Sequence, residues 1–302
     1  MTRTNRTRRR SGVVTATMVV LAGLAGPGGA LAGPAASASA SVSAPAAAPA
    51  AVAEDPQGDG RLVVSYDPGE TEADGQAEAF LEDRQVLEDV ADYATARIAL
   101  PQDIPLRAAS CGEANAYWDP DTQSITLCYE LIEELDPLFA AQNTTGTPDE
   151  QSEAVAQDLV GFTNGTLLHE LGHGLVDLYH LPITGREEDA VDQLAMLLLA
   201  DDVEHKAYAV STINAWAALA SAEEEGQRPI EAYADQHSLD AQRYYNWVCW
   251  LYGSAPDEYA DVVETAQSPD GVLPEDRAQQ CPAEFQSINE SWSTLLRPYL
   301  KV

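Results

Sequence analysis

Residues 166–194 read TLLHELGHGLVDLYHLPITGREEDAVDQL and combine a helical pattern with a histidine motif. The apolar side chains of the first half recur every three or four residues, as they do on one face of an α-helix. These side chains are Leu167, Leu168, Leu171, Leu175 and Leu178. We predict a helix from Ala154 to about Tyr179. It ends before Leu181-Pro182, because a residue that precedes proline disfavours the helical conformation. The motif His169-Glu170-Leu171-Gly172-His173 lies inside it.

The two histidines of the motif are four residues apart. This spacing places both imidazoles on one helix face, one turn apart, where both can bind a single metal ion. Glu170 is rotated by about 100° from His169, so it lies beside such an ion, where a general base is needed. The alternative is a pair of hydrogen-bonded core histidines. It is the weaker interpretation, because the chain has only five histidines.

A catalytic zinc ion needs a third protein ligand and one open position. Asp177 shares the face of His169 and His173, but its eight-residue separation from His169 corresponds to about 12 Å along the helix axis. His180 follows at the wrong spacing for a third histidine ligand. The third ligand must therefore come from another segment of the chain.

The next helical segment offers two carboxylates four residues apart, Glu188 and Asp192. The helix face that carries both carboxylates continues through Ala195 and Leu199, so we expect it to point inward. A carboxylate buried on such a face needs a partner. Glu188 as the third zinc ligand meets this need. Asp192 meets it by accepting the outer N–H of a ligand histidine.

The same segment leaves alternatives open. Thr184-Gly185-Arg186-Glu187 has the form of a helix capping box, which gives Glu187 a structural role. Glu187 and Asp189 nevertheless remain alternatives to Glu188 as the third ligand, because acidic residues are abundant throughout the chain.

Peptide hydrolysis also needs a group that stabilises the developing oxyanion. We predict His237 for this role, with Asp240 three residues later orienting its ring. Tyr244 and Tyr245 are alternatives, and a surface histidine that caps a helix is an equally good interpretation of His237.

The motif followed by a later Glu-x-x-x-Asp resembles the gluzincin pattern. The chain also resembles an uncharacterised bacterial family of putative zinc metallopeptidases, in three stretches: residues 169–173, 181–194 and 237–243. The resemblance covers most of residues 60–300, including the four cysteines. It implies a zincin-like fold and zinc as cofactor, but it supplies no substrate.

Composition and charge restrict the function further. The chain has 302 residues, 45% of them hydrophobic, and a formal net charge of -33. Such an acidic surface repels nucleic acid and anionic membranes, which bind through Lys and Arg. We therefore expect neither as a partner.

The N-terminus has the features of a secretory signal peptide, which we place at residues 1–32. Arginines end at Arg10, an apolar segment runs from Val13 to about Leu24, and Ala30-Leu31-Ala32 provides small residues for cleavage. The alternative, a membrane anchor, is disfavoured because the apolar run is shorter than the about 20 residues that span a bilayer. We expect a secreted protein without stable membrane insertion after cleavage.

Residues 33–57 are rich in Ala, Ser and Pro and are expected to form a linker. Residues 58–302 then form one domain. Its four cysteines, an even number in an exported chain, suit two disulfides. Three pairings are open. We favour Cys111 with Cys128 and Cys249 with Cys281, because each closes a modest loop.

The remaining patterns predict the fold class. Strands are expected at residues 62–66 and 104–110, a hairpin at 114–129, and one helix at 77–98. Nearly everything from residue 130 onward has a helical pattern. The class is therefore α+β, with a small N-terminal sheet and a mostly helical remainder.

Together these features predict a secreted zinc-dependent peptidase. His169, His173 and Glu188 hold Zn²⁺, and Glu170 is the general base. Two alternatives are a zinc-dependent amidase acting on a non-peptide substrate and an inactive zincin that serves as an extracellular binding module. The expected partner is a peptide or protein substrate, for which the hairpin could provide an edge strand. Neither the substrate's identity nor the oligomeric state follows from the sequence.

Overall fold

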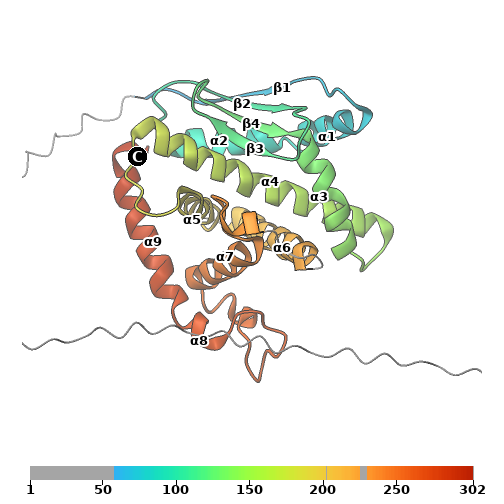
Figure 1. Cartoon of the computed structure of the whole chain (residues 1–302), viewed down its shortest axis with the longest axis vertical. Coiled ribbons are helices and arrows are strands. Elements are labelled where there is room, and N and C mark those ends of the chain that lie inside the picture. The colour runs from blue at the N-terminus through green and yellow to red at the C-terminus, as the bar shows by residue number, and fades with distance from the viewer. Residues whose placement is uncertain (1–57, 202, 225–229, 302) are drawn as a thin grey trace, which may run out of the picture. The chain divides into compact units, whose positions relative to one another are not determined.

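The computed structural model describes residues 58–201, 203–224 and 230–301. The signal peptide and linker that we predict for residues 1–57 lie outside the described residues. Figure 1 shows the arrangement, with the sheet on one side of the long helix α4 and the later helices on the other.

The sheet has four strands in the order β1-β2-β4-β3. They are β1 (Leu62–Tyr66), β2 (Ile104–Ala109), β3 (Ala116–Asp119) and β4 (Ser124–Cys128). β1, β2 and β4 are parallel, whereas β3 is the antiparallel edge strand of the predicted hairpin. Burial alternates along β1 and β2, as in a sheet with one face against the core. The strand predictions at 62–66 and 104–110 and the predicted hairpin are therefore confirmed.

Two helices connect β1 to β2, α1 (Glu72–Asp83) and α2 (Val86–Arg97). Our prediction of a single helix over 77–98 is wrong. Gln85 has a left-handed backbone with φ of 53°, which interrupts the helix. The apolar periodicity continues through the break because both Leu81 and Val86 are fully buried. Periodicity alone therefore did not show the interruption.

The chain then forms α3 (Tyr129–Gln142) and the long helix α4 (Pro148–Tyr179). α4 begins earlier than Ala154, because Thr147 and Glu150 form a capping box and Pro148 occupies the first turn. α4 packs against β3 and β4 on one side and against α5 and α6 on the other. It therefore connects the sheet to the helical remainder.

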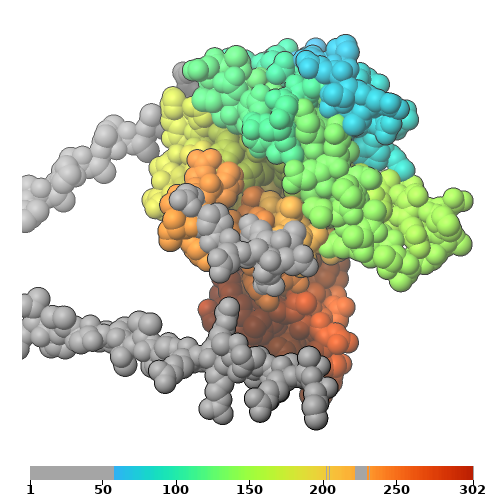
Figure 2. All heavy atoms as spheres, turned by 45° about the vertical axis from the view of Figure 1, so that its right-hand side comes forward, coloured from blue at the N-terminus to red at the C-terminus, as the bar shows by residue number. Residues whose placement is uncertain are grey.

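The remaining elements are helical. They are α5 (Glu187–Leu199), α6 (Val203–Glu224), η1 (Ile230–Tyr233), α7 (Asp240–Ser254), η2 (Ala260–Val262), α8 (Glu275–Ala278), α9 (Cys281–Leu296) and η3 (Arg297–Tyr299). α6 packs on α4, α7 on α6, and α9 on α7. In the space-filling view the sheet is blue to green at the top, and the C-terminal helices are orange and red below it (Figure 2). The prediction of a mixed α+β fold with a small sheet and a mostly helical remainder is confirmed.

Two disulfides are present, and both have the pairing that we favoured. Cys111–Cys128 joins the segment after β2 to the end of β4, and Cys249–Cys281 joins α7 to α9. Two disulfides fit an extracellular protein. In the described part of the chain, every helix is too short or too polar to cross a membrane.

Candidate metal centre

The middle of α4 brings the two motif histidines into the interior. Their ring nitrogens Nε2 lie 3.3 Å apart, and His169 is buried. Close packing around the motif depends on glycine. A Cβ on Gly172 would lie 2.8 Å from the Cβ of Val191, and one on Gly174 would lie 3.0 Å from the Trp118 ring. These glycines let α5 and β3 approach α4 at the level of the histidines.

Glu188, at the start of α5, reaches both histidines. Its Oε2 lies 3.2 Å from Nε2 of His169 and 3.2 Å from Nε2 of His173. Nε2 of His237 lies 3.1 Å from the same oxygen. Three imidazole nitrogens and one carboxylate oxygen therefore converge on one small region.

This geometry fits a metal ion. Ligand atoms at 2.0–2.2 Å from a tetrahedral ion are about 3.4 Å from one another, close to the 3.1–3.3 Å separations found here. The ligand atoms of His169, Glu188 and His237 all lie within 4.8 Å of one another. Nitrogen and carboxylate donors are those that zinc takes in catalytic sites.

The electrostatics of the centre also call for a cation. Burial alone would lower the pKa of His169, but the Asp192 and Glu188 carboxylates raise it to about 9. Burial opposes ionisation of Glu188, yet hydrogen bonds to three imidazoles hold its pKa far below the usual range. Carboxylates that favour positive charge on the imidazoles also favour a metal ion at the same place, because a metal ion can replace protons on its ligands.

The outer nitrogen of His169 faces a buried carboxylate. Asp192 Oδ1 lies 2.7 Å from His169 Nδ1, which is the contact that we expected of an outer carboxylate. Arg243 of α7 donates to both oxygens of Asp192, at 2.8 Å and 2.6 Å, and its guanidinium lies 3.7 Å from the centroid of the Trp216 ring. No role for Arg243 follows from the sequence patterns described above. The signal that could have found it is the need of a buried Asp192 for a cation.

Glu187 has a different contact from the one that the sequence suggested. α5 begins at Glu187 without a side-chain cap, so the predicted capping box with Thr184 is absent. Glu187 Oε1 instead lies 2.8 Å from Nδ1 of His173 and orients that ring. Asp189, another alternative ligand, accepts a hydrogen bond from Ser238.

The segment before α7 carries His237 to the centre. Arg186 donates a hydrogen bond to the His237 carbonyl, and Asp235 Oδ1 lies 3.1 Å from the ring nitrogen Nδ1. The sequence pointed to Asp240 as the residue that orients this ring, whereas Asp235 makes the contact. The other ring nitrogen, Nε2, is then directed toward Glu188.

Glu170 lies where α4 packs against β3. Its Oε2 accepts a hydrogen bond from the backbone N–H of Trp118 at 2.9 Å. Burial raises the pKa of Glu170, which the positive histidines only partly oppose. A buried carboxylate that is held in place and has a raised pKa is suited to accept a proton.

An open cleft of about 690 Å³ borders the centre, between β3, the second half of α4, the start of α5 and His237. A smaller pocket of about 140 Å³ shares Glu170 and His237 with the cleft. Its wall includes Phe162, Trp216 and Trp247. The structure thus places an open groove next to a small pocket with aromatic side chains in its wall, at the histidines.

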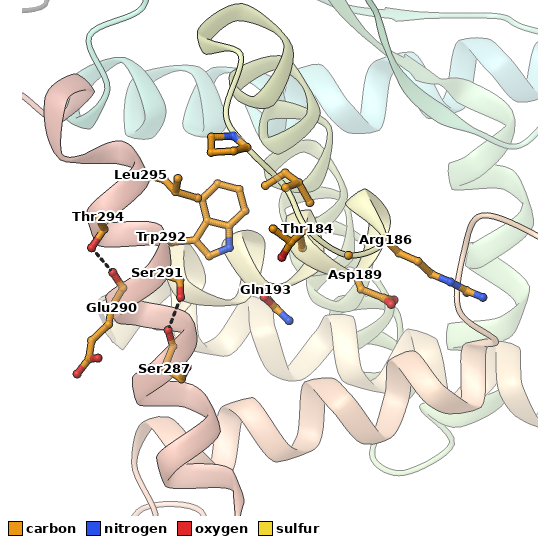
Figure 3. A pocket seen from close by; sticks show the side chains of 14 residues that line it. Thr184, Arg186, Asp189, Gln193, Ser287, Glu290, Ser291, Trp292, Thr294 and Leu295 are labelled. Atoms are coloured by element: carbon orange, nitrogen blue, oxygen red, sulfur yellow. Dashed lines mark hydrogen bonds between the residues drawn. The ribbon is translucent and has the colours of Figure 1, made fainter. Parts of the chain in front are cut away.

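A further cavity of about 790 Å³ lies between residues 182–186, α5 and α9 (Figure 3). Trp292 projects toward it from α9, and Gln193 from α5. None of the four converging ligand residues lines it, so we assign it no part in the chemistry.

Comparison with known proteins gives one match. No curated protein and no solved structure matches the chain. Residues 66–296, most of the chain, match the sequence profile of a family described as "Putative metallopeptidase". A metallopeptidase requires a metal cofactor, and the converging residues described above can hold one. The chain therefore belongs to this putative metallopeptidase family.

Proposed function

We propose that the protein is a secreted zinc-dependent peptidase with a zincin-like active site. The observation that carries this proposal is the convergence of three ligand atoms, Nε2 of His169, Nε2 of His173 and Oε2 of Glu188. They lie within 3.3 Å of one another. Glu170, the residue next to His169, is held by Trp118 at the border of the cleft. Family membership supports peptidase activity, and the donor set favours zinc.

Each residue of the centre has its own role in the proposed hydrolysis. His169, His173 and Glu188 hold the ion, and a bound zinc ion supplies Lewis acidity that polarises a carbonyl and acidifies water. Glu170 accepts a proton from the attacking water and passes it to the nitrogen of the leaving amine. The Trp118 N–H fixes one Glu170 oxygen during both transfers. His237 donates a hydrogen bond to the developing oxyanion.

The surroundings of the site suit a peptide. β3 is the edge strand of the sheet and borders the cleft, so an extended chain can lie beside it. The 140 Å³ pocket beside Glu170 offers Phe162 and Trp216 to a side chain. A groove for the backbone next to a pocket for a side chain favours a peptide over a compact amide.

Cleavage of a diverse peptide mixture tests the proposal, with zinc content measured on the same sample. We expect stoichiometric zinc, cleavage that a chelator abolishes, and recovery on adding zinc. The matched variant is Glu170→Gln, whose amide oxygen can still accept from Trp118. It should keep zinc and lose about 10²–10⁴-fold in kcat/KM.

Each other outcome has a definite meaning. Loss of zinc from Glu170→Gln would refute the assignment of Glu170 as the base. Stoichiometric zinc without cleavage of any peptide would refute the peptidase and favour an amidase or a binding module. A protein that binds no zinc would refute the metal centre itself. Secretion is tested separately, by N-terminal sequencing of the protein recovered from the medium, which should begin near residue 33.

A further inference from the structure

Asp177 lies one helical turn beyond His173 and lines the cleft next to the metal centre. It is too far along α4 to share an ion with His169, so the proposed chemistry gives it no task. Its Oδ2 accepts a hydrogen bond from Nε1 of Trp118, at 3.2 Å. Asp177 is half-buried, and among the described residues no Lys or Arg forms an ion pair with it.

The acidic side chains of the cleft lie beside the imidazoles of His173, His180 and His237. The lining of the cleft includes Glu170, Asp177, Glu187 and Glu188, but no Lys or Arg among the described residues. A divalent ion would be offset by Glu170 and Glu188. Asp177 and Glu187 then remain as negative charges. Glu187 orients the ring of His173 beside the ion, whereas Asp177 lies one helical turn farther along the cleft.

The Trp118 indole forms the wall beside Asp177. It packs against Gly174 and lines the same cleft. An aromatic surface next to a carboxylate suits a lysine or arginine side chain, because the aliphatic stem packs on the ring and the charged head reaches the carboxylate. Both side chains line the same cleft, Asp177 from α4 and Trp118 from β3, so one substrate side chain can contact both.

We propose that Asp177 and Trp118 form a specificity subsite that selects peptides with a lysine or arginine side chain. This inference rests on the peptidase function proposed above and adds a substrate class to it. Asp177 acts on substrate binding and takes no part in the bond-breaking step. A half-exposed ion pair of this kind contributes about 5-fold in binding. It weakens at high ionic strength because salt screens the charges.

The test uses peptides that differ at one position, which holds lysine, acetyl-lysine or glutamate in turn. Acetyl-lysine keeps the stem and removes the charge. For the wild-type zinc enzyme, kcat/KM should be about 5-fold higher with lysine at one position near the scissile bond, and most of the difference should lie in KM. The advantage should shrink at high salt.

Three variants locate the effect. Asp177→Asn keeps an acceptor for Trp118 and should remove the lysine advantage, whereas Asp177→Glu should retain it. Asp270→Asn makes the same charge change on an exposed loop outside the cleft and should leave the preference unaltered. Zinc content and circular dichroism confirm that each variant is folded.

The outcomes separate this inference from the function on which it rests. If no peptide is cleaved by the zinc-loaded enzyme, both fail. If peptides are cleaved but lysine and acetyl-lysine are equivalent in the wild type, only the subsite fails, even where Asp177→Asn does not fold. An undiminished lysine advantage in folded Asp177→Asn would also overturn it.

Discussion

At the scale of single residues, the two acids at the start of α5 have different contacts. Glu188 reaches both Nε2 atoms, whereas Glu187 contacts only the outer nitrogen of His173. We predict that Glu188→Ala abolishes stoichiometric zinc binding. Glu187→Ala should weaken it by about 10-fold, the effect of losing an orienting carboxylate. Competition with a chelator measures both affinities.

If Glu187 had only the structural role of a capping residue, Glu187→Ala would mainly lower stability. Unfolding curves of the zinc-free variant, compared with those of the zinc-free wild type, separate the two effects. If Glu187→Ala loses zinc completely and Glu188→Ala keeps it, the ligand assignment on α5 is wrong.

His237 can be tested in the same way. It is proposed to stabilise the oxyanion, but its Nε2 lies as close to Glu188 as those of the two motif histidines. We predict that His237→Ala retains zinc and loses about 10²-fold in kcat. Zinc analysis with steady-state kinetics decides. A zinc-free His237→Ala protein would move His237 from oxyanion stabilisation to the ligand set.

The sequence predicted the parts of the centre that a single helix encodes. Helical spacing alone indicated that His169 and His173 share a face, and the stripe through Asp192 indicated Glu188. The contacts of Arg243 and Trp118 depend on how separate elements pack, and no local pattern encodes that packing. The Asp235 contact is local, two residues before His237, but the sequence offered Asp240 at a similar separation and did not discriminate between them. These contacts became apparent only in the folded chain.

At the scale of elements, the start of α1 is fixed by one buried carboxylate. Asp74 completes a capping box with Thr71, and it accepts the Ser110 hydroxyl at 2.7 Å. The hydrogen bond from Ser110 lowers the pKa of Asp74, although burial opposes this. Its folded pKa is below the unfolded one. Its stabilisation is therefore present above the unfolded pKa and is lost as the pH falls through the folded pKa.

We predict that Asp74→Asn lowers the free energy of unfolding by about 1–3 kcal/mol at about pH 7. The difference from the wild type should shrink as the pH falls below the ordinary aspartate range, because the wild-type carboxylate then becomes protonated. Urea unfolding at several pH values measures it. Asp136→Asn, an exposed acid on α3, is the control and should change little at either pH. A loss in Asp74→Asn that stays constant with pH would contradict the ionic origin.

Elements were predicted best where one signal dominated. Alternation and β-branched residues marked β1 and β4, and helical periodicity marked α4. The break between α1 and α2 was missed, because Gln85 adopts a left-handed conformation that its residue type does not announce. The start of α4 was placed too late, because its polar first turns carry caps but few apolar residues.

At the scale of the whole molecule, the C-terminal helices are tied to the site by one covalent bond. Cys249–Cys281 joins α7, which carries Arg243, to α9. We predict that replacing both cysteines by serine lowers the free energy of unfolding by about 3–4 kcal/mol, from loop-closure entropy alone. Denaturant unfolding under non-reducing conditions, which leave Cys111–Cys128 intact, measures the loss. An unchanged stability would show that the packing of α7 on α9 suffices without the bond.

The segments that form the centre lie far apart in the sequence, so they are synthesised one after another. α4 supplies two imidazoles, α5 one carboxylate, the segment before α7 a third imidazole, and α7 the arginine that holds Asp192. A nascent chain that has emerged only as far as α6 has both motif histidines but neither His237 nor Arg243. During synthesis the chain therefore cannot become a working enzyme until most of it has been made. The order of these segments along the chain therefore determines when the centre can form.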